Sequence, residues 1–270
     1  MYGNARSSFF IFELVLNFPT LTFIPMKNFL ILVIALLFIH AENLAQLKFE
    51  SDNFPTSAGN LKITFIGHAS LMMEFHGKVI QIDPWTSEAD YTRLPKADII
   101  LVTHHHADHF DSSAIRILTK KNTELLLTAT CRNMIGKGTV MTVGDQKKIK
   151  GILIQSVYAY NLVHLDENGK PYHEKGKCNG YVLTFGNKRV YVAGDTEDIP
   201  EMKNLPPIDV AFLPMNLPYT MTPDMVKNCV TMLKPKILYP YHFGSMEYAE
   251  DLATQLKNDK GTEVRIRKFE

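Results

Sequence analysis

The residues best suited to chemistry lie in the segment ILVTHHHADHFD, residues 100–111. They form an HxHxDH pattern made of His104, His106, Asp108 and His109. Side chains two residues apart point the same way in extended backbone, so His104 and His106 face one point, and a turn brings Asp108 and His109 toward a second. Imidazole nitrogen and carboxylate oxygen are good ligands for zinc, and also for manganese or iron. The pattern therefore predicts a site for two divalent metal ions.

Two further segments each bring one donor to the end of an apolar strand. VYVAGDTED, residues 190–198, carries Asp195, and ILYPYHFGS, residues 237–245, carries His242. Taken singly, an Asp after Gly is more often a turn or a helix cap, and a His at a strand end is usually just hydrogen-bonded. A solvated polar loop is the corresponding alternative for the HxHxDH segment. Three strand ends that converge on one sheet edge favour the metal site.

Short apolar runs separated by turns must position these donors. The expected strands are residues 61–68, 70–75, 78–83, 97–103, 180–185, 188–194, 209–214 and 236–241. The expected helices are 223–234, which Thr222 and Pro223 would begin, and 245–257. Two β-rich halves, each with its own helices, predict an α/β (α+β) chain with two sheets packed face to face and helices outside.

The segments THHHADH, AGDT and PYHFG, in this order and spacing, resemble the metallo-β-lactamase superfamily over roughly residues 60–245. FIGHASLMMEF, VIQIDPW, AYN, GYVLTF, AGDTEDIPEM and LPYTMTP look most like the branch that contains L-ascorbate-6-phosphate lactonase and N-acyl phosphatidylethanolamine phospholipase D. The resemblance implies a four-layer αββα sandwich, a metal-dependent hydrolase activity and two bound metal ions, with zinc the first choice. It assigns the first metal to His104 and His106, the second to Asp108, His109 and His242, and the bridging position to Asp195. Asp108 and His109 also take the catalytic role.

One ligand of the first metal is open between two histidines. Many relatives carry a PAxH segment, but the matching VYAYN ends in Asn161. Some relatives with AYN have a downstream His in an HPKG-like element, and YHEKG at residues 172–176 makes His173 the matching candidate. His164, three residues after Asn161, is the competing choice.

Other polar residues near strand ends are expected to support the site. Asp83 in IDPW is placed to accept a hydrogen bond from a ligand His and so to fix its tautomer. For His68 in GHAS we expect a buried, hydrogen-bonded histidine rather than a ligand. Asn216, Tyr219 and Thr220 follow a strand on the same edge and would line the pocket, although capping and loop packing explain them equally well.

The expected reaction is attack by a metal-bound hydroxide on an ester, lactone or phosphodiester bond of a small molecule. No GxSxG elbow points to a serine nucleophile. Two alternatives stay open: a phospholipase D-like phosphodiesterase, and a catalytically silent, metal-loaded periplasmic binding protein. Lys plus Arg (29) nearly balances Asp plus Glu (28), so no net field recruits nucleic acid.

The N-terminal part reads as a targeting segment. Residues 26–46, MKNFLILVIALLFIHAENLAQ, have the anatomy of a signal peptide, and the apolar run at 29–39 is too short to span a bilayer. We therefore expect a leader at residues 1–45 with translation starting at Met26, and one hydrolase domain at 46–270. This predicts a periplasmic or secreted protein without a stable membrane anchor after cleavage. A longer leader or an N-terminal membrane segment is the alternative. The three cysteines exclude a complete disulfide framework, and the oligomeric state is not predicted.

Overall fold

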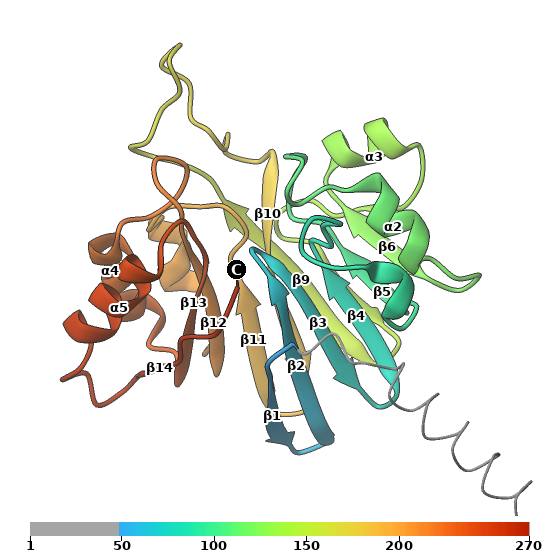
Figure 1. Ribbon diagram of the computed structural model, residues 1–270, viewed down its shortest axis with the longest axis horizontal. Helices are drawn as coiled ribbons and strands as arrows, with labels where there is room; N and C mark the ends of the chain where they lie inside the picture. Colours follow the sequence, from blue (N-terminus) through green and yellow to red (C-terminus); the bar gives the residue numbers. More distant parts are fainter. Residues whose placement is uncertain (1–48, 270) are drawn as a thin grey trace, which may run out of the picture. The chain divides into compact units, whose positions relative to one another are not determined.

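Two seven-stranded mixed sheets form the centre of the molecule (Figure 1). The structure is a computed structural model that describes residues 49–269. The unit Leu47–Glu270 is compact, and the single hydrolase domain expected at residues 46–270 stays a prediction. The predicted leader and the start at Met26 lie outside the described residues.

The first sheet contains the N-terminal half of the described chain, in the order β1-β2-β3-β4-β5-β6-β7. From β1 to β4 each strand pairs antiparallel with the next, and from β4 to β7 each strand pairs parallel with the next. Its strands are β1 (Ser51–Thr56), β2 (Gly59–Gly67), β3 (Ser70–Phe75), β4 (Lys78–Ile82), β5 (Ile99–Leu101), β6 (Glu124–Leu127) and β7 (Thr139–Val140).

The second sheet has the order β14-β13-β12-β11-β10-β9-β8. It mirrors the first, because β8 to β11 pair antiparallel and β11 to β14 pair parallel. Its strands are β8 (Gln146–Ile149), β9 (Ile152–Ala159), β10 (Cys178–Phe185), β11 (Lys188–Val192), β12 (Val210–Met215), β13 (Ile237–Phe243) and β14 (Glu263–Val264).

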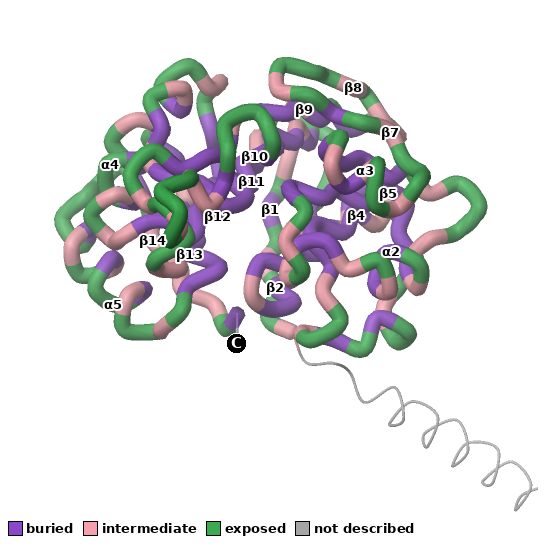
Figure 2. Tube along the Cα trace, turned by 90° about the horizontal axis from the view of Figure 1, so that it is seen from above, coloured by how far each residue is buried: buried purple, intermediate pink, exposed green. Residues whose placement is uncertain are grey.

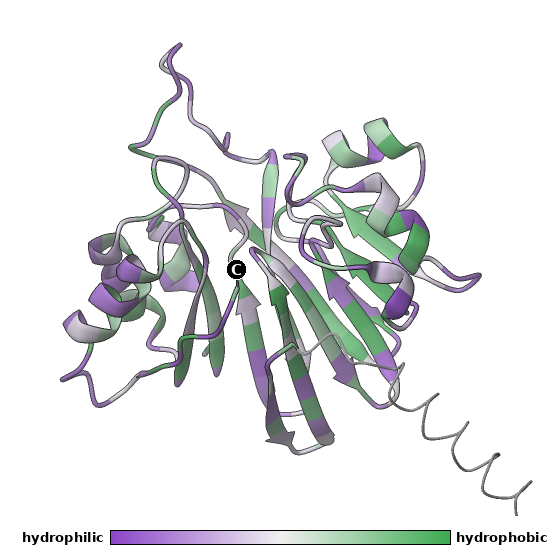
Figure 3. Ribbon diagram, in the orientation of Figure 1, coloured by the Kyte–Doolittle hydropathy of each residue, from purple (hydrophilic) through white to green (hydrophobic). Residues whose placement is uncertain are grey.

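The alternation of side chains along β5 and the residue that follows it, Val102, shows how the layers are built. Ile99 and Leu101 belong to the large core between the two sheets, whereas Ile100 and Val102 pack in a second core under the helices of the first half. A strand covered on both faces was expected from the continuous apolar run, and it is confirmed. Figure 2 shows the buried residues concentrated in the strands of both sheets, and Figure 3 shows hydrophobic residues concentrated in the central strands.

Helices cover the outer faces of both sheets (Figure 1). They are α2 (Ser112–Leu118) and α3 (Ala129–Ile135) on the first half, and α4 (Pro223–Leu233) and α5 (Met246–Gln255) on the second; the short 3-10 turns η1 (Tyr91–Arg93) and η2 (Pro200–Asn204) accompany them. As predicted, Thr222 caps α4 by accepting a hydrogen bond from the Met225 N–H. The four-layer αββα sandwich is thus confirmed, while α2 and α3 were not predicted.

All three cysteines are buried and unpaired, so no disulfide joins the two halves. Within residues 49–269, no helix is both long enough and apolar enough to cross a membrane.

Candidate metal centre

The predicted donors meet where strands of both sheets end. His104 and the rest of the HxHxDH turn follow β5, Asp195 follows β11, and His242 lies near the end of β13. His173 comes from the segment between β9 and β10, which extends away from the sheets in olive in Figure 1. The first sheet thus supplies four donors and the second sheet, with its connecting segment, supplies three.

Three imidazole nitrogens converge in a first group made of His104, His106 and His173. Nε2 of His104 lies 3.1 Å from Nδ1 of His106, which lies 3.2 Å from Nε2 of His173. Ligands at about 2.0–2.1 Å from a tetrahedral zinc ion are about 3.3 Å apart, so these spacings match such a site. Asp195 is next to it, with Oδ2 3.2 Å from Nε2 of His173.

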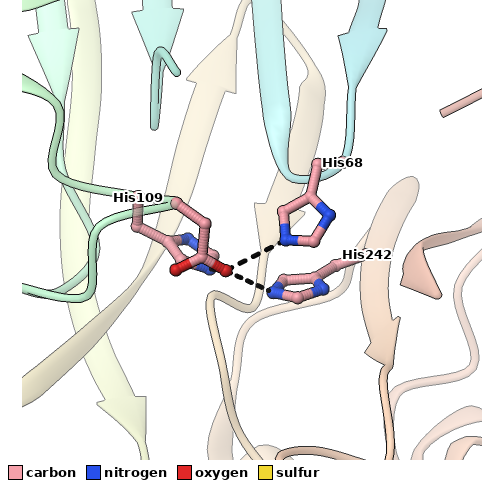
Figure 4. A group of neighbouring side chains, drawn as sticks. His68, His109 and His242 are labelled. Atoms are coloured by element: carbon pink, nitrogen blue, oxygen red, sulfur yellow. Dashed lines mark hydrogen bonds and ion pairs between the residues drawn. The ribbon is translucent and has the colours of Figure 1, made fainter. Parts of the chain in front are cut away.

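The second group contains Asp108, His109 and His242, together with His68. Oδ2 of Asp108 lies 3.5 Å from Nε2 of His109 and 3.4 Å from Nε2 of His242. Figure 4 shows the three imidazoles grouped around this carboxylate, with dashed lines to His68 and His242. The spacings again match those between ligands of one ion.

Asp195 connects the two groups. Its Oδ1 lies 3.3 Å from Nε2 of His109, and its Oδ2 lies 3.5 Å from Nε2 of His242 and 3.2 Å from Nε2 of His173. Its side chain is only 4% exposed, so it faces the donors of both groups rather than solvent. Asp195 therefore lies between the two groups, within 3.5 Å of donors from each.

Several buried donor atoms support the fit of metal ions to these residues. Nε2 of His109, Nε2 of His242 and Oδ1 of Asp195 make no hydrogen bond within the described part of the chain. Buried polar atoms are nearly always satisfied, and unsatisfied ones call for a partner such as an ion. Divalent cations held by mixed nitrogen and oxygen donors fit this set.

The electrostatics differ between the two groups. Burial lowers the pKa of His106 to about 4, with a further contribution from His173, so its ring is neutral and one of its two nitrogens has a lone pair free to bind a cation. Burial also favours the neutral form of His242, but Asp195 and Asp108 outweigh it and raise its pKa to about 10. Positive charge is therefore favoured beside the two carboxylates, as a bound cation would provide.

Asp83 holds one histidine of each group on the side of the ring that faces away from the site. As expected, it accepts a hydrogen bond from a candidate ligand: its Oδ2 lies 2.8 Å from Nδ1 of His109. The same oxygen accepts the Thr103 hydroxyl at 2.6 Å, and that hydroxyl lies 3.0 Å from Nδ1 of His104. One carboxylate thus orients His109 directly and His104 through Thr103, leaving Nε2 of each ring directed at the site.

Strained backbone accompanies the site. Six residues other than glycine have positive φ within residues 49–269, and three of them are His68 (50°), Asp83 (43°) and His242 (46°). The pairing of β12 with β13 skips His242, since Tyr241 pairs with Pro214 and Phe243 with Met215. Such a bulge redirects a side chain, and local strain of this kind concentrates at functional sites.

Gly194 shows why a glycine precedes Asp195. Its φ is +63°, and a Cβ there would lie 2.9 Å from the Asn179 carbonyl and 3.0 Å from Cβ of Thr103. The strand carrying Asp195 therefore approaches the HxHxDH turn closely only because residue 194 has no side chain.

The two candidates for the remaining donor lie in different surroundings. His173 is 1% exposed and joins the first group. His164 instead places Nδ1 2.7 Å from Oε1 of Glu197 and belongs to none of the donor groups. Asn161 accepts hydrogen bonds from the backbone N–H and from Nδ1 of His173, so it supports the histidine that the resemblance favoured.

One feature was predicted only in part and one was missed. His68 makes the expected hydrogen bond, with Nε2 3.0 Å from Oδ2 of Asp108, but its side chain is 23% exposed rather than buried, and its ring centroid lies 3.8 Å from that of His242. Glu197 was not singled out, although it is fully buried and contacts Asn161 and His164. Its place two residues after Asp195 was the one local signal.

A cavity of about 410 Å³ opens onto the donors. It is lined by His106, Asp108, Asp195, His242, Tyr172, Asn216 and Tyr219. The rings of Tyr172 and Tyr219 meet edge-on with centroids 5.0 Å apart and form a wall. Two of the residues expected in the pocket, Asn216 and Tyr219, thus line it, whereas Thr220 is buried and its hydroxyl accepts the Asn216 N–H.

Comparison with known proteins agrees with this geometry. The family model described as "Beta-lactamase superfamily domain" matches residues 62–242. The UPF0173 metal-dependent hydrolase of Nanoarchaeum equitans is 31% identical over 196 residues, covering 68% of this chain and 85% of the relative. That of Thermococcus kodakarensis is 31% identical over 198 residues, with the same two coverages.

Solved structures give the same picture. A Parabacteroides distasonis protein that bears the name of a metal-dependent hydrolase is 46% identical, with a TM-score of 0.78, and the match covers 82% of this chain and all of that one. Igni18, a metallo hydrolase from Ignicoccus hospitalis, has a TM-score of 0.64 at 23% identity, covering 77% and 95% of the two chains, and supports the fold alone. The narrower resemblance to the ascorbate lactonase and phospholipase D branch stays a prediction.

With a family match across the whole donor set and curated relatives matched over most of their length, the chain belongs to the beta-lactamase superfamily and, within it, to the UPF0173 metal-dependent hydrolases.

Proposed function

We propose that this metal-dependent hydrolase binds two divalent cations, zinc first among them, and cleaves an ester or lactone bond of a small molecule. The observation that carries the proposal is the arrangement of two donor groups around Asp195. His104, His106 and His173 would hold one ion, Asp108, His109 and His242 the other, and Asp195 would bridge them. When bound, such a pair lowers the pKa of water toward neutrality and polarises the substrate oxygen.

The side chains divide the remaining work. Asp108, 29% exposed, reaches the cavity and is held by His68, while His109 lies fully buried behind it and is held by Asp83. Tyr172 and Tyr219 form an aromatic wall that shields the reacting bond from bulk water. The Asn216 side chain offers amide atoms for orienting a substrate carbonyl. Asp108 and His109 would hold the second cation beside the cavity, and they are therefore the proposed catalytic residues.

The charge of the cavity favours an ester or lactone over a phosphodiester. Lys and Arg are absent from the described residues that line it. A phosphodiester carries a permanent negative charge, which proteins usually bind with Arg or Lys as well as with metal ions. Lys170 and Lys177 line a neighbouring cavity of about 370 Å³ that shares only His106 and Tyr172 with the first. Phosphodiester cleavage is therefore the second candidate.

The test is a comparison of metal-free and metal-loaded protein on three chromogenic substrates: an aryl ester, a lactone and a bis-aryl phosphodiester. We expect ester or lactone hydrolysis that disappears on chelation and returns with two equivalents of zinc. Equal activity without metal would refute the proposal, and phosphodiester cleavage alone would replace it by the second candidate. Metal binding with no turnover of any substrate would favour the alternative that the chain is a catalytically silent, metal-loaded binding protein.

A further inference from the structure

The third donor of the first group is delivered differently from the others. His104 and His106 follow a strand directly, but His173 lies in the connection between β9 and β10. Residues 161–173 of this connection, here called the donor loop, contain no regular strand or helix and only one isolated bridge, between Leu165 and Pro171. Something other than a sheet must therefore fix the position of His173.

Glu197 holds the first residues of the donor loop. Its Oε2 accepts the backbone N–H groups of Leu162 and Val163 at 2.6 and 2.7 Å. Its Oε1 accepts hydrogen bonds from the backbone N–H and from the Nδ1–H of His164, both at 2.7 Å. Three consecutive backbone donors thus point at one carboxylate that is fully buried. Burial of a charge is unfavourable, but these charge-assisted hydrogen bonds offset it.

The same carboxylate sets the orientation of Asn161. Nδ2 of Asn161 donates to Oε1 of Glu197 and to the Tyr219 carbonyl, both at 2.9 Å. Because a carboxylate and a carbonyl only accept, the amide nitrogen of Asn161 must face them. Oδ1 is therefore directed at His173.

The orientation of Asn161 in turn fixes the tautomer of His173. Oδ1 accepts the His173 backbone N–H at 3.0 Å and lies 2.7 Å from its Nδ1. Since Oδ1 has no proton, Nδ1 of His173 carries one, and Nε2 presents its lone pair to His106 and Asp195. Both the place and the tautomer of the third donor depend on Glu197.

We propose that Glu197 is a positioning residue that assembles the first metal site, by folding the donor loop and fixing the His173 tautomer through Asn161. The inference rests on the proposed function in so far as a metal occupies that site. The second group has no part in this chain of contacts. Its members are held by Asp83 and by the ends of β5 and β13. Loss of Glu197 should therefore affect the first site and spare the second.

The decisive variant is Glu197→Gln, because a glutamine amide nitrogen cannot accept the backbone N–H groups. We expect about 10- to 100-fold weaker binding of one zinc ion per chain, the loss typical of removing a group that supports a ligand, with the other ion unaffected. Nitrogen-15 spectra of the His side chains should show that His173 loses its single Nδ1–H tautomer. The amides of residues 162–164 should exchange faster with solvent.

Glu201→Gln is the matched control, since Glu201 lies four residues away, is 26% exposed, and binds Lys175 and the Tyr160 hydroxyl rather than the donor loop. It should retain both ions and the tautomer. A second variant, Asn161→Ala, keeps the bonds from the backbone of residues 162–164 to Glu197 but removes the acceptor for His173, so it should lose the tautomer with little change in exchange of those amides.

Tautomer and exchange are read in metal-free protein as well, so the inference is tested even if no metal binds. Wild-type zinc stoichiometry and affinity in Glu197→Gln, or an unchanged His173 tautomer in that variant, would overturn the inference. Failure of the wild-type protein to bind any metal would instead overturn the proposed function.

Discussion

Asp83 directly follows β4, and His109 lies in the turn after the neighbouring strand β5. The two residues share a hydrogen bond of 2.8 Å, with both side chains fully buried. Asp83 also accepts the N–H and hydroxyl of Thr103. Asp83→Asn places an amide N–H among three donors, so one of them loses its acceptor. We expect about 10- to 100-fold weaker zinc binding and a loss of about 1–3 kcal/mol in unfolding free energy. Chelator competition and urea unfolding of the metal-free protein measure the two effects.

The two candidate histidines of the donor loop can be separated by metal content. His173→Ala should leave one tightly bound ion per chain, because it removes one of three nitrogens in the first group. His164→Ala should retain both ions, since His164 contacts Glu197 and not the donors. Elemental analysis after dialysis gives the count. Two ions in His173→Ala, or one in His164→Ala, would reverse the assignment.

His68 should act by holding Asp108 and not as a ligand. Its Nε2 lies 3.0 Å from Oδ2 of Asp108, an ordinary hydrogen-bond length and shorter than the other separations within the second group. His68→Ala should therefore keep two ions but bind the second about tenfold more weakly. His68→Gln, which can still donate a hydrogen bond, should recover much of that loss. Loss of a whole ion from His68→Ala would make His68 a ligand instead.

Asp52 should make stability depend on pH. Burial raises its pKa, but hydrogen bonds from Tyr239 and Arg267 outweigh this effect and hold the pKa below its ordinary value of 3.8. A lowered folded-state pKa stabilises the protein above the unfolded value, and this stabilisation disappears as pH falls through the folded pKa. Asp52→Asn should lower the free energy of unfolding by about 1–3 kcal/mol at pH 7, and by progressively less below pH 4.

Urea unfolding of wild type and Asp52→Asn across pH 3–7 checks this dependence. Glu74→Gln is the control, because Glu74 pairs with Lys62 at 3.0 Å but both side chains are well exposed. Such a pair contributes under about 1 kcal/mol. A constant difference between wild type and Asp52→Asn at all pH values would contradict the prediction.

Much of the donor set was predictable because it follows from local pattern. His104 and His242 stand at the ends of apolar runs, and strand ends meet at one edge of a sheet. The role of Asp83 followed from the same reasoning. Helices α2 and α3 were not predicted, since each has seven residues and carries little periodic signal. Their caps, Asp111 and Thr128, are visible in the sequence only once the boundaries are known.

The contacts of the donor loop were not predictable for a different reason. Glu197 and Asn161 are 36 residues apart, and nothing near either residue indicates that the two meet. His173 was chosen from a family resemblance and not from its own surroundings. The place of His68 depends on a hairpin turn with positive φ, which residues other than glycine adopt in only a few per cent of cases and which no local pattern revealed.

The donors are divided between two sheets that no disulfide connects. A cation shared by Asp108 and His242 would therefore act as a removable cross-link between the N-terminal and C-terminal halves. Because only the folded chain assembles these donors, ligand linkage would add about 3 kcal/mol to folding stability when free metal exceeds its Kd about a hundredfold. The unfolding temperature of this protein would then rise with the concentration of free metal ion, whether or not a substrate is present.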